Sequence, residues 1–181
     1  MPNVFSDNFA ATPSGAYDAS HKVGANLSHA RVRQKFMKVD IPVEATGLTI
    51  TLGKFKSGDR LKKLELSTRD AAPGAGAINL GLYRVGVAFD MVPIAGNILD
   101  VDLFASAVAI ATQLSDVDVL VEAGSVDAYH RNLALWEMYN LTDGSYASDP
   151  MEDWLLVATL STGVTTAAAG CSFVADMVSF G

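Results

Sequence analysis

Three segments near the middle of the chain alternate apolar and polar residues, the pattern of a β-strand with one buried and one solvated face. They span residues 48–52, 64–66 and 78–82, and every apolar position in them is leucine or isoleucine. Ser57-Gly58-Asp59 separates the first two segments, and a loop of small residues at 71–77 precedes the third. Because glycine readily adopts the positive φ of a tight turn, the first two segments are predicted to form a hairpin. The sequence therefore predicts a central antiparallel sheet.

Alternation also marks strands on either side of this sheet. A first strand is predicted to begin near Phe36 and to end at an edge or terminus at Pro42, because proline cannot donate to a strand ladder. Three further strands are predicted at residues 117–121, 154–160 and 171–180. The buried core is predicted to include Ile50, Leu64, Leu80, Leu82, Trp136, Leu156 and Phe173.

Two lysines that follow the first alternating segment break its pattern of apolar and polar faces. Lys54 and Lys56 continue the spacing of Ile50 and Leu52, so a regular strand would point their ammonium groups into the core. A β-bulge inserts one residue and reverses the faces of those that follow it. The sequence therefore predicts a bulge at Gly53.

Two short helices are predicted outside the strands. Asp100 suits the N-cap of a helix at 101–106, and the helix dipole favours a second aspartate, Asp102, in its first turn. A helix at 131–140 has Leu133, Trp136 and Tyr139 spaced by three, which places them on one face against the sheet. The combined pattern predicts a mainly β fold, an antiparallel β-sandwich with one or two short helices, of which the jelly roll is one variant.

The first 30 residues differ from the rest of the chain. They are rich in small and polar residues and show a period of neither 2 nor 3.6, so residues 1–30 are predicted to be an extended arm. A chain of 181 residues fits one domain, and its apolar half excludes a disordered chain, so residues 31–181 are predicted to fold as one sandwich domain. Phe5, Phe9 and Tyr17 distinguish the arm from a purely solvated tail. We expect these three aromatic residues to contact a partner.

Charge is distributed unevenly along the chain. Residues 1–70 carry a balance of +4 and residues 71–181 a balance of −11, with no Lys or Arg between Arg84 and Arg131. The overall acidity disfavours nucleic-acid binding. The densest basic group is predicted either to be a solvated sheet face or to bind an acidic partner surface. Its members are Lys54, Lys56, Arg60, Lys62 and Lys63.

No arrangement of residues indicates catalysis or a cofactor. The single cysteine, Cys171, excludes an internal disulfide and lies in an apolar alternating segment typical of a buried thiol. His130 has no nucleophile or carboxylate arranged around it as a triad requires. Gly74-Ala75-Gly76 precedes a strand and not a helix, which excludes a dinucleotide loop. The sequence predicts no enzyme, no metal and no cofactor. The uncharged run at 154–175 has a turn of small and polar residues at its centre and is not predicted to span a membrane.

The order of several local motifs resembles that of the small head proteins of tailed phages that decorate or cement the capsid. The resemblance covers residues 31–181. Its motifs are Leu48-Thr49-Ile50-Thr51-Leu52-Gly53-Lys54 with Gly58-Asp59-Arg60-Leu61, then Leu80-Gly81-Leu82-Tyr83, Asp100-Val101-Asp102-Leu103-Phe104-Ala105-Ser106, Leu135-Trp136-Glu137, Asp149-Pro150, and residues 165–180.

This resemblance implies a jelly-roll-like virion protein that binds the outer surface of a phage capsid. It implies the major capsid protein as partner, a symmetric homo-oligomer such as a trimer, and assembly in the cytoplasm of the bacterial host. Two other classes of protein stay open. A β-sandwich module on a tail or fibre would bind a carbohydrate or another virion protein through exposed aromatic residues. A cupin-like enzyme would need two or three histidines near a glutamate, whereas two of the three histidines lie in the arm.

Overall fold

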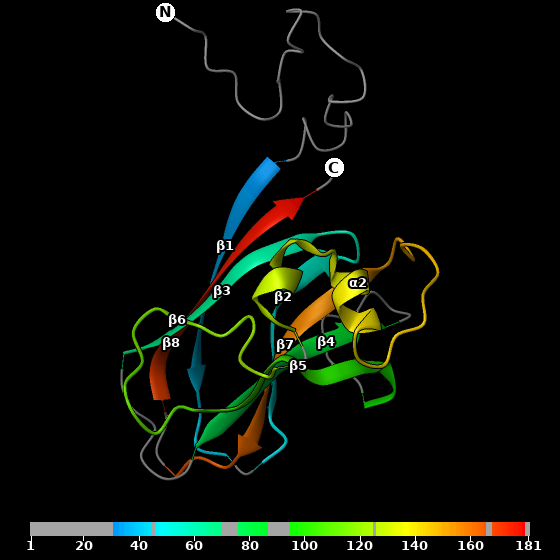
Figure 1. Ribbon diagram of the computed structural model, residues 1–181. Helices are drawn as coiled ribbons and strands as arrows, with labels where there is room; N and C mark the ends of the chain where they lie inside the picture. Colours follow the sequence, from blue (N-terminus) through cyan, green and yellow to red (C-terminus); the bar gives the residue numbers. More distant parts are fainter. Residues whose placement is uncertain are drawn as a thin grey trace, which may run out of the picture. The chain divides into compact units, whose positions relative to one another are not determined.

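The computed structural model describes residues 31–44, 46–69, 76–86, 95–124, 126–165 and 168–179, of which 32–179 belong to one compact unit (Figure 1). The predicted arm, with Phe5, Phe9 and Tyr17, lies outside the described residues. Eight strands make up the described part: β1 (Arg31–Ile41), β2 (Thr49–Lys56), β3 (Arg60–Thr68), β4 (Ala77–Arg84), β5 (Ile98–Ala109), β6 (Val117–Asp118), β7 (Asp153–Thr162) and β8 (Ala168–Ser179).

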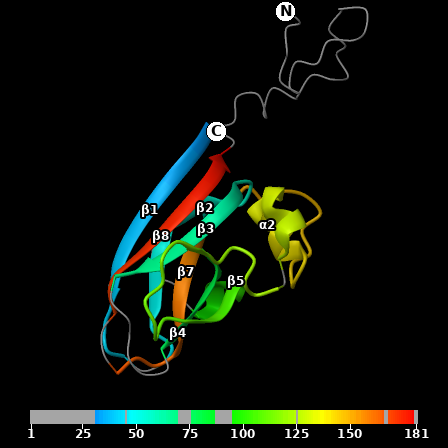
Figure 2. The same ribbon diagram turned by 60° about the vertical axis from the view of Figure 1, so that its left-hand side comes forward.

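The strands form two four-stranded sheets with the orders β1-β8-β3-β6 and β2-β7-β4-β5 (Figures 1 and 2). The chain changes sheet at every connection except the one from β4 to β5. Eight strands arranged in two sheets by such long-range pairing form a jelly roll. The predicted fold class, a mainly β antiparallel sandwich, is confirmed.

The predicted hairpin is wrong, although both of its strands exist. β2 pairs with β7 in one sheet, whereas β3 pairs with β6 and β8 in the other. Ser57–Asp59 therefore carries the chain from one sheet to the other. The Asp59 carboxylate closes this crossing by accepting a hydrogen bond from the backbone N–H of Lys56, at 2.8 Å. Alternation along the chain identifies strands, but it does not identify their partners.

Five of the seven predicted core residues are buried, and the other two are half-buried. Leu64, Leu80, Leu82, Leu156 and Phe173 belong to a single cluster between the two sheets. Ile50 and Trp136 pack against that cluster from its margin. β7 also buries its opposite face, where Leu155 and Val157 form a second cluster with Tyr83 of β4. Burial on both faces explains the nearly continuous apolar sequence of β7.

The helix predicted at 101–106 is wrong, because these residues lie within β5. Asp100 does accept a hydrogen bond from the N–H of Asp102, at 3.1 Å, which is the contact that an N-cap would make. Here the contact accompanies a bulge. Leu80 and Leu82 of β4 are opposite Ala105 and Asp100, so extra residues of β5 fall between two neighbouring positions of β4. A local aspartate turn in a bulged strand therefore has the same sequence pattern as a helix start.

The helix predicted at 131–140 is shorter than expected. A 3₁₀ helix, η4 (Ala128–Asn132), precedes α2 (Leu135–Asn140). Leu135 and Met138 are the buried residues of α2, whereas the predicted trio Leu133, Trp136 and Tyr139 is only half-buried. Within the described ranges, no helix is long and apolar enough to cross a bilayer. A second 3₁₀ helix, η3 (Ala95–Asn97), leads into β5.

Several smaller predictions can be compared with the strands. The bulge near Gly53 is confirmed, since the register of β2 against β7 shifts between Thr51 and Gly53. Pro42 directly follows β1, an edge strand, as predicted. The prediction that β1 begins near Phe36 is wrong, because β1 begins at Arg31. The strand predicted at 117–121 is only two residues long, since the chain turns after Asp118.

Candidate docking surface

The five basic residues singled out in the sequence lie on strands of two different sheets. Lys54 and Lys56 are on β2, at the edge of one sheet. Arg60, Lys62 and Lys63 are on β3, inside the other sheet. The crossing at Ser57–Asp59 connects the two groups, which therefore differ in their surroundings and can contact different partners.

Lys54 and Lys56 share one carboxylate on the neighbouring strand β7. The Lys54 ammonium lies 3.2 Å from Asp153 Oδ2, and the Lys56 ammonium lies 2.5 Å from Asp153 Oδ1. Hydrogen bonds from Lys56 and Lys54 hold the pKa of Asp153 below its ordinary value, although desolvation opposes them. Both lysine side chains remain well exposed, at 46% and 63%. They are therefore available to a partner.

The β3 group has a different set of contacts. Lys62 is exposed, and its backbone carbonyl accepts a hydrogen bond from Arg131 at 3.2 Å. Lys63 forms an ion pair of 2.5 Å with Glu65, and this hydrogen bond raises the pKa of Lys63. Arg131 also pairs with Asp118 of β6, at 2.5 Å. Lys62 is thus the most accessible charge of this group.

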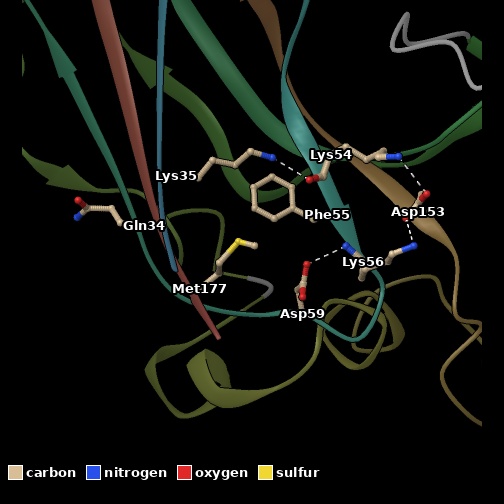
Figure 3. Close-up of a pocket in the computed structure, with 8 residues that line it drawn as sticks. All are labelled: Gln34, Lys35, Lys54, Phe55, Lys56, Asp59, Asp153 and Met177. Atoms are coloured by element: carbon tan, nitrogen blue, oxygen red, sulfur yellow. Dashed lines mark hydrogen bonds and ion pairs between the residues drawn. The ribbon is translucent and has the colours of Figure 1, made fainter. Parts of the chain in front are cut away.

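A hollow of about 270 Å³ opens between the edges of the two sheets, where β1 lies beside β2 (Figure 3). Three ammonium groups and two carboxylates line it, so its charged groups carry a net positive charge. The lining residues are Gln34, Lys35, Lys54, Phe55, Lys56, Asp59, Asp153 and Met177.

Lys35 crosses this hollow from β1 to β2. Its ammonium donates to the backbone carbonyl of Lys54 at 2.8 Å and lies 4.4 Å from the centre of the Phe55 ring (Figure 3). Burial lowers the pKa of Lys35, an effect that Asp59 opposes and Lys54 reinforces. Both direct contacts are with uncharged groups. Among the described residues, no carboxylate lies within ion-pair distance of Lys35.

Lys35 was not among the predicted partner-binding residues, although the sequence contains a signal for it. Its position has the same parity as Met37 and Ile41, which are buried. The strand predicted from Phe36 onward leaves Lys35 out, whereas β1 includes Lys35 and directs its side chain toward β2. Gly53 of β2 leaves room for it, because a Cβ atom at that position would lie 2.8 Å from the Lys35 ammonium.

We expect the substitution Lys35→Met to change the free energy of unfolding by less than about 1 kcal/mol, as measured by urea denaturation. Methionine keeps an unbranched stem but loses a charged hydrogen bond and a cation–π contact, and the removed cost of burying an ammonium offsets that loss. The lowered pKa also predicts that wild-type stability rises with pH as Lys35 deprotonates, in a window that ends at the ordinary value of 10.5. The Lys35→Met protein should lack that part of the rise. A large loss of stability would instead show that the contacts of Lys35 hold the two sheets together.

Other candidate chemistry has a structural explanation. Cys171 is fully buried, and burial, with a smaller effect of Asp40, raises the pKa of its thiol to about 11. Trp154 is buried, and its ring centre lies 6.1 Å from those of Tyr139 and Tyr146. In the part of the chain that the structure describes, no group of three or more His, Cys, Asp and Glu residues is placed to hold a metal ion.

Neither a protein-family model nor a curated protein sequence matches this chain. Among solved structures, the chain is similar to one in the capsid of Ralstonia phage GP4, with a TM-score of 0.53, 15% identity, and coverage of 82% of this chain and 84% of that chain. A chain in the capsid asymmetric unit of cyanophage Pam1 has a TM-score of 0.47 and 14% identity, over 93% and 96% of the two chains. A chain of infectious bursal disease virus, Gx strain, has a TM-score of 0.45 and 14% identity, over 83% and 32%. The first of these similarities extends through most of both chains and shows that this protein shares the fold of a phage capsid component.

Proposed function

We propose that this protein is a non-enzymatic structural component of a virion that binds the outer surface of a phage capsid and decorates or cements it. The observation that carries the proposal is the jelly roll shared with a chain in the capsid of Ralstonia phage GP4. Jelly rolls also serve as lectins and enzymes, so the fold alone does not assign a function. The order of sequence motifs supplies independent support, because it resembles that of phage head decoration proteins.

The partner in this proposal is the major capsid protein, and the docking residues are those of the β3 group. Lys62 is exposed and Lys63 is half-buried on the same strand, with the Arg131 side chain bonded to the carbonyl of Lys62. A basic group of this kind speeds and orients the encounter with an acidic surface. The molecule itself would assemble as a homo-oligomer on the particle.

The double charge reversal Lys62→Glu with Lys63→Glu tests the proposal. We expect it to slow association with capsids that lack the protein by several-fold, and to change dissociation less, because surface charges act mainly on encounter. The difference between the two proteins should shrink as the Debye length falls from about 10 Å at 0.1 M salt to about 3 Å at 1 M. Surface plasmon resonance on immobilised particles would measure both rates.

The variant Lys62→Arg with Lys63→Arg is the matched control, since it keeps the charge and should bind as the wild type does. Urea unfolding of each variant would verify that the fold is kept. Failure of the wild-type protein to bind such particles would contradict the proposed function. Equal association rates for the wild type and the charge-reversed variant would contradict only the choice of docking residues. The aromatic residues Phe5, Phe9 and Tyr17 of the arm would then be the candidates for docking.

A further inference from the structure

The hollow at the β1–β2 side has one more ammonium group than carboxylates, since Asp59 and Asp153 face three lysines there. We call Lys35, Lys54 and Lys56 the basic edge. Asp153 pairs with two of these lysines, whereas the direct contacts of Lys35 within the described residues are with a carbonyl and an aromatic ring, and Asp59 attracts it from beyond ion-pair distance. A half-buried ammonium without a direct counter-ion gains most from a carboxylate brought by a partner, because solvent screens the pair less there than at an open surface.

The opposite side of the molecule carries the complementary charge. Asp100 and Asp102 lie on β5, and Glu122 lies in the turn that follows β6. Ser106 links two of these residues, since its hydroxyl donates to Asp102 at 2.9 Å and its N–H donates to Glu122 at 2.9 Å. Within the described residues, none of these three carboxylates has a Lys or Arg at ion-pair distance. We call the three residues the acidic edge.

The surroundings of Asp100 raise the pKa of its carboxyl group. Burial raises it, and the neighbouring Asp102 raises it further, although hydrogen bonds from the Asp102 N–H and from Thr142 act in the opposite direction. No lysine or arginine occurs between Arg84 and Arg131, the stretch that supplies the whole acidic edge. These carboxylates therefore have no lysine or arginine close to them in the sequence.

The two edges lie at the two ends of one sheet. β2 and β5 are the outer strands of the order β2-β7-β4-β5, so one molecule can present both edges at the same time. The basic edge also includes β1, the outer strand of the other sheet, on which Lys38 is exposed as well. Two different surfaces that complement each other produce a head-to-tail contact, which forms a ring when the rotation between copies closes.

We propose that the hollow at the basic edge binds the acidic edge of a second copy of this chain. The carboxylates of Asp100, Asp102 and Glu122 from one copy meet Lys35, Lys54 and Lys56 of the next. This inference deepens the homo-oligomer part of the proposed function, and it concerns self-association in solution, which can be measured without a capsid.

Charge reversal of each edge, separately and together, tests the proposal. Lys54→Glu with Lys56→Glu leaves two acidic edges, and Asp102→Lys with Glu122→Lys leaves two basic ones. Each variant alone should self-associate at least about tenfold more weakly than the wild type in sedimentation equilibrium at low salt, because like charges then face each other. The protein with all four substitutions has both edges exchanged and should recover association. Mixing the protein that has two acidic edges with the protein that has two basic edges should also restore association.

Two further variants separate this contact from effects on the fold and on capsid binding. Lys35→Met should weaken association with little change in stability, and Lys62→Glu with Lys63→Glu, an equal change of charge on β3, should leave association unaltered. If the Asp102→Lys, Glu122→Lys protein does not fold, Asp102→Asn with Glu122→Gln replaces it, with a smaller expected loss. A wild-type protein that stays monomeric, or a four-fold variant that does not recover, would overturn the proposal. Capsid binding by a variant that no longer self-associates would leave the proposed function intact.

Discussion

Replacing Leu82 by alanine should lower the free energy of unfolding by about 2–5 kcal/mol, and Leu80→Ala should do the same. Both side chains are at most 1% exposed and belong to the cluster between the sheets. Their strand, β4, lies between β5 and β7, so strands on both sides hold the backbone in place. The site therefore cannot collapse around the missing atoms, and a cavity is expected.

Urea unfolding at equilibrium would measure this loss. Leu141→Ala is the matched control, because Leu141 is 44% exposed and its truncation should change stability by less than about 0.5 kcal/mol. A loss near zero for both Leu80→Ala and Leu82→Ala would show that β4 is not part of the core.

The sequence predicts most of the strands because alternation is a local property of the chain. β4, β7 and β8 were each predicted from their own residues, and even the bulge of β2 follows from the parity of Lys54 and Lys56. Strand partners are not local. β2 and β3 were expected to pair because they are adjacent in the chain, whereas in a jelly roll the chain usually changes sheet between consecutive strands. Burial alone does not distinguish the two arrangements, since both place the same residues inside.

The candidate docking surface was predictable only in part, for the same reason. Clustering along the sequence grouped Lys54 and Lys56 with Lys62 and Lys63, although they lie in different sheets. It also missed Lys35, which is about twenty residues away in the chain but donates to the carbonyl of Lys54. The two charged edges required the strand order, because only that order places β2 and β5 at opposite ends of one sheet. The sequence shows the imbalance of charge along the chain, but it does not show where the charged residues lie in the fold.

The second large effect is expected at Gly81, where space and not backbone conformation requires glycine. Gly81 lies on β4 between Leu80 and Leu82, and β5 bulges over it. A Cβ atom at this position would lie inside van der Waals contact with backbone atoms of Asp100 and Val101. Backbone cannot rotate away as a flexible side chain can, so either the bulge or the pairing of β4 with β5 must shift.

We therefore expect Gly81→Ala to lower the free energy of unfolding by at least about 1–3 kcal/mol, the usual cost of inserting a methyl group where no space exists. Gly96→Ala is the matched control, since nothing lies within 4 Å of the added atom and its φ is not in the left-handed region. Because the displaced backbone carries Asp100, with Asp102 close by, Gly81→Ala should also weaken self-association, which Gly96→Ala should not. The prediction would be contradicted if Gly81→Ala unfolded at the same urea midpoint as the wild type and self-associated equally well. That result would show that β5 does not cross Gly81 in this way and that the bulge does not position the acidic edge.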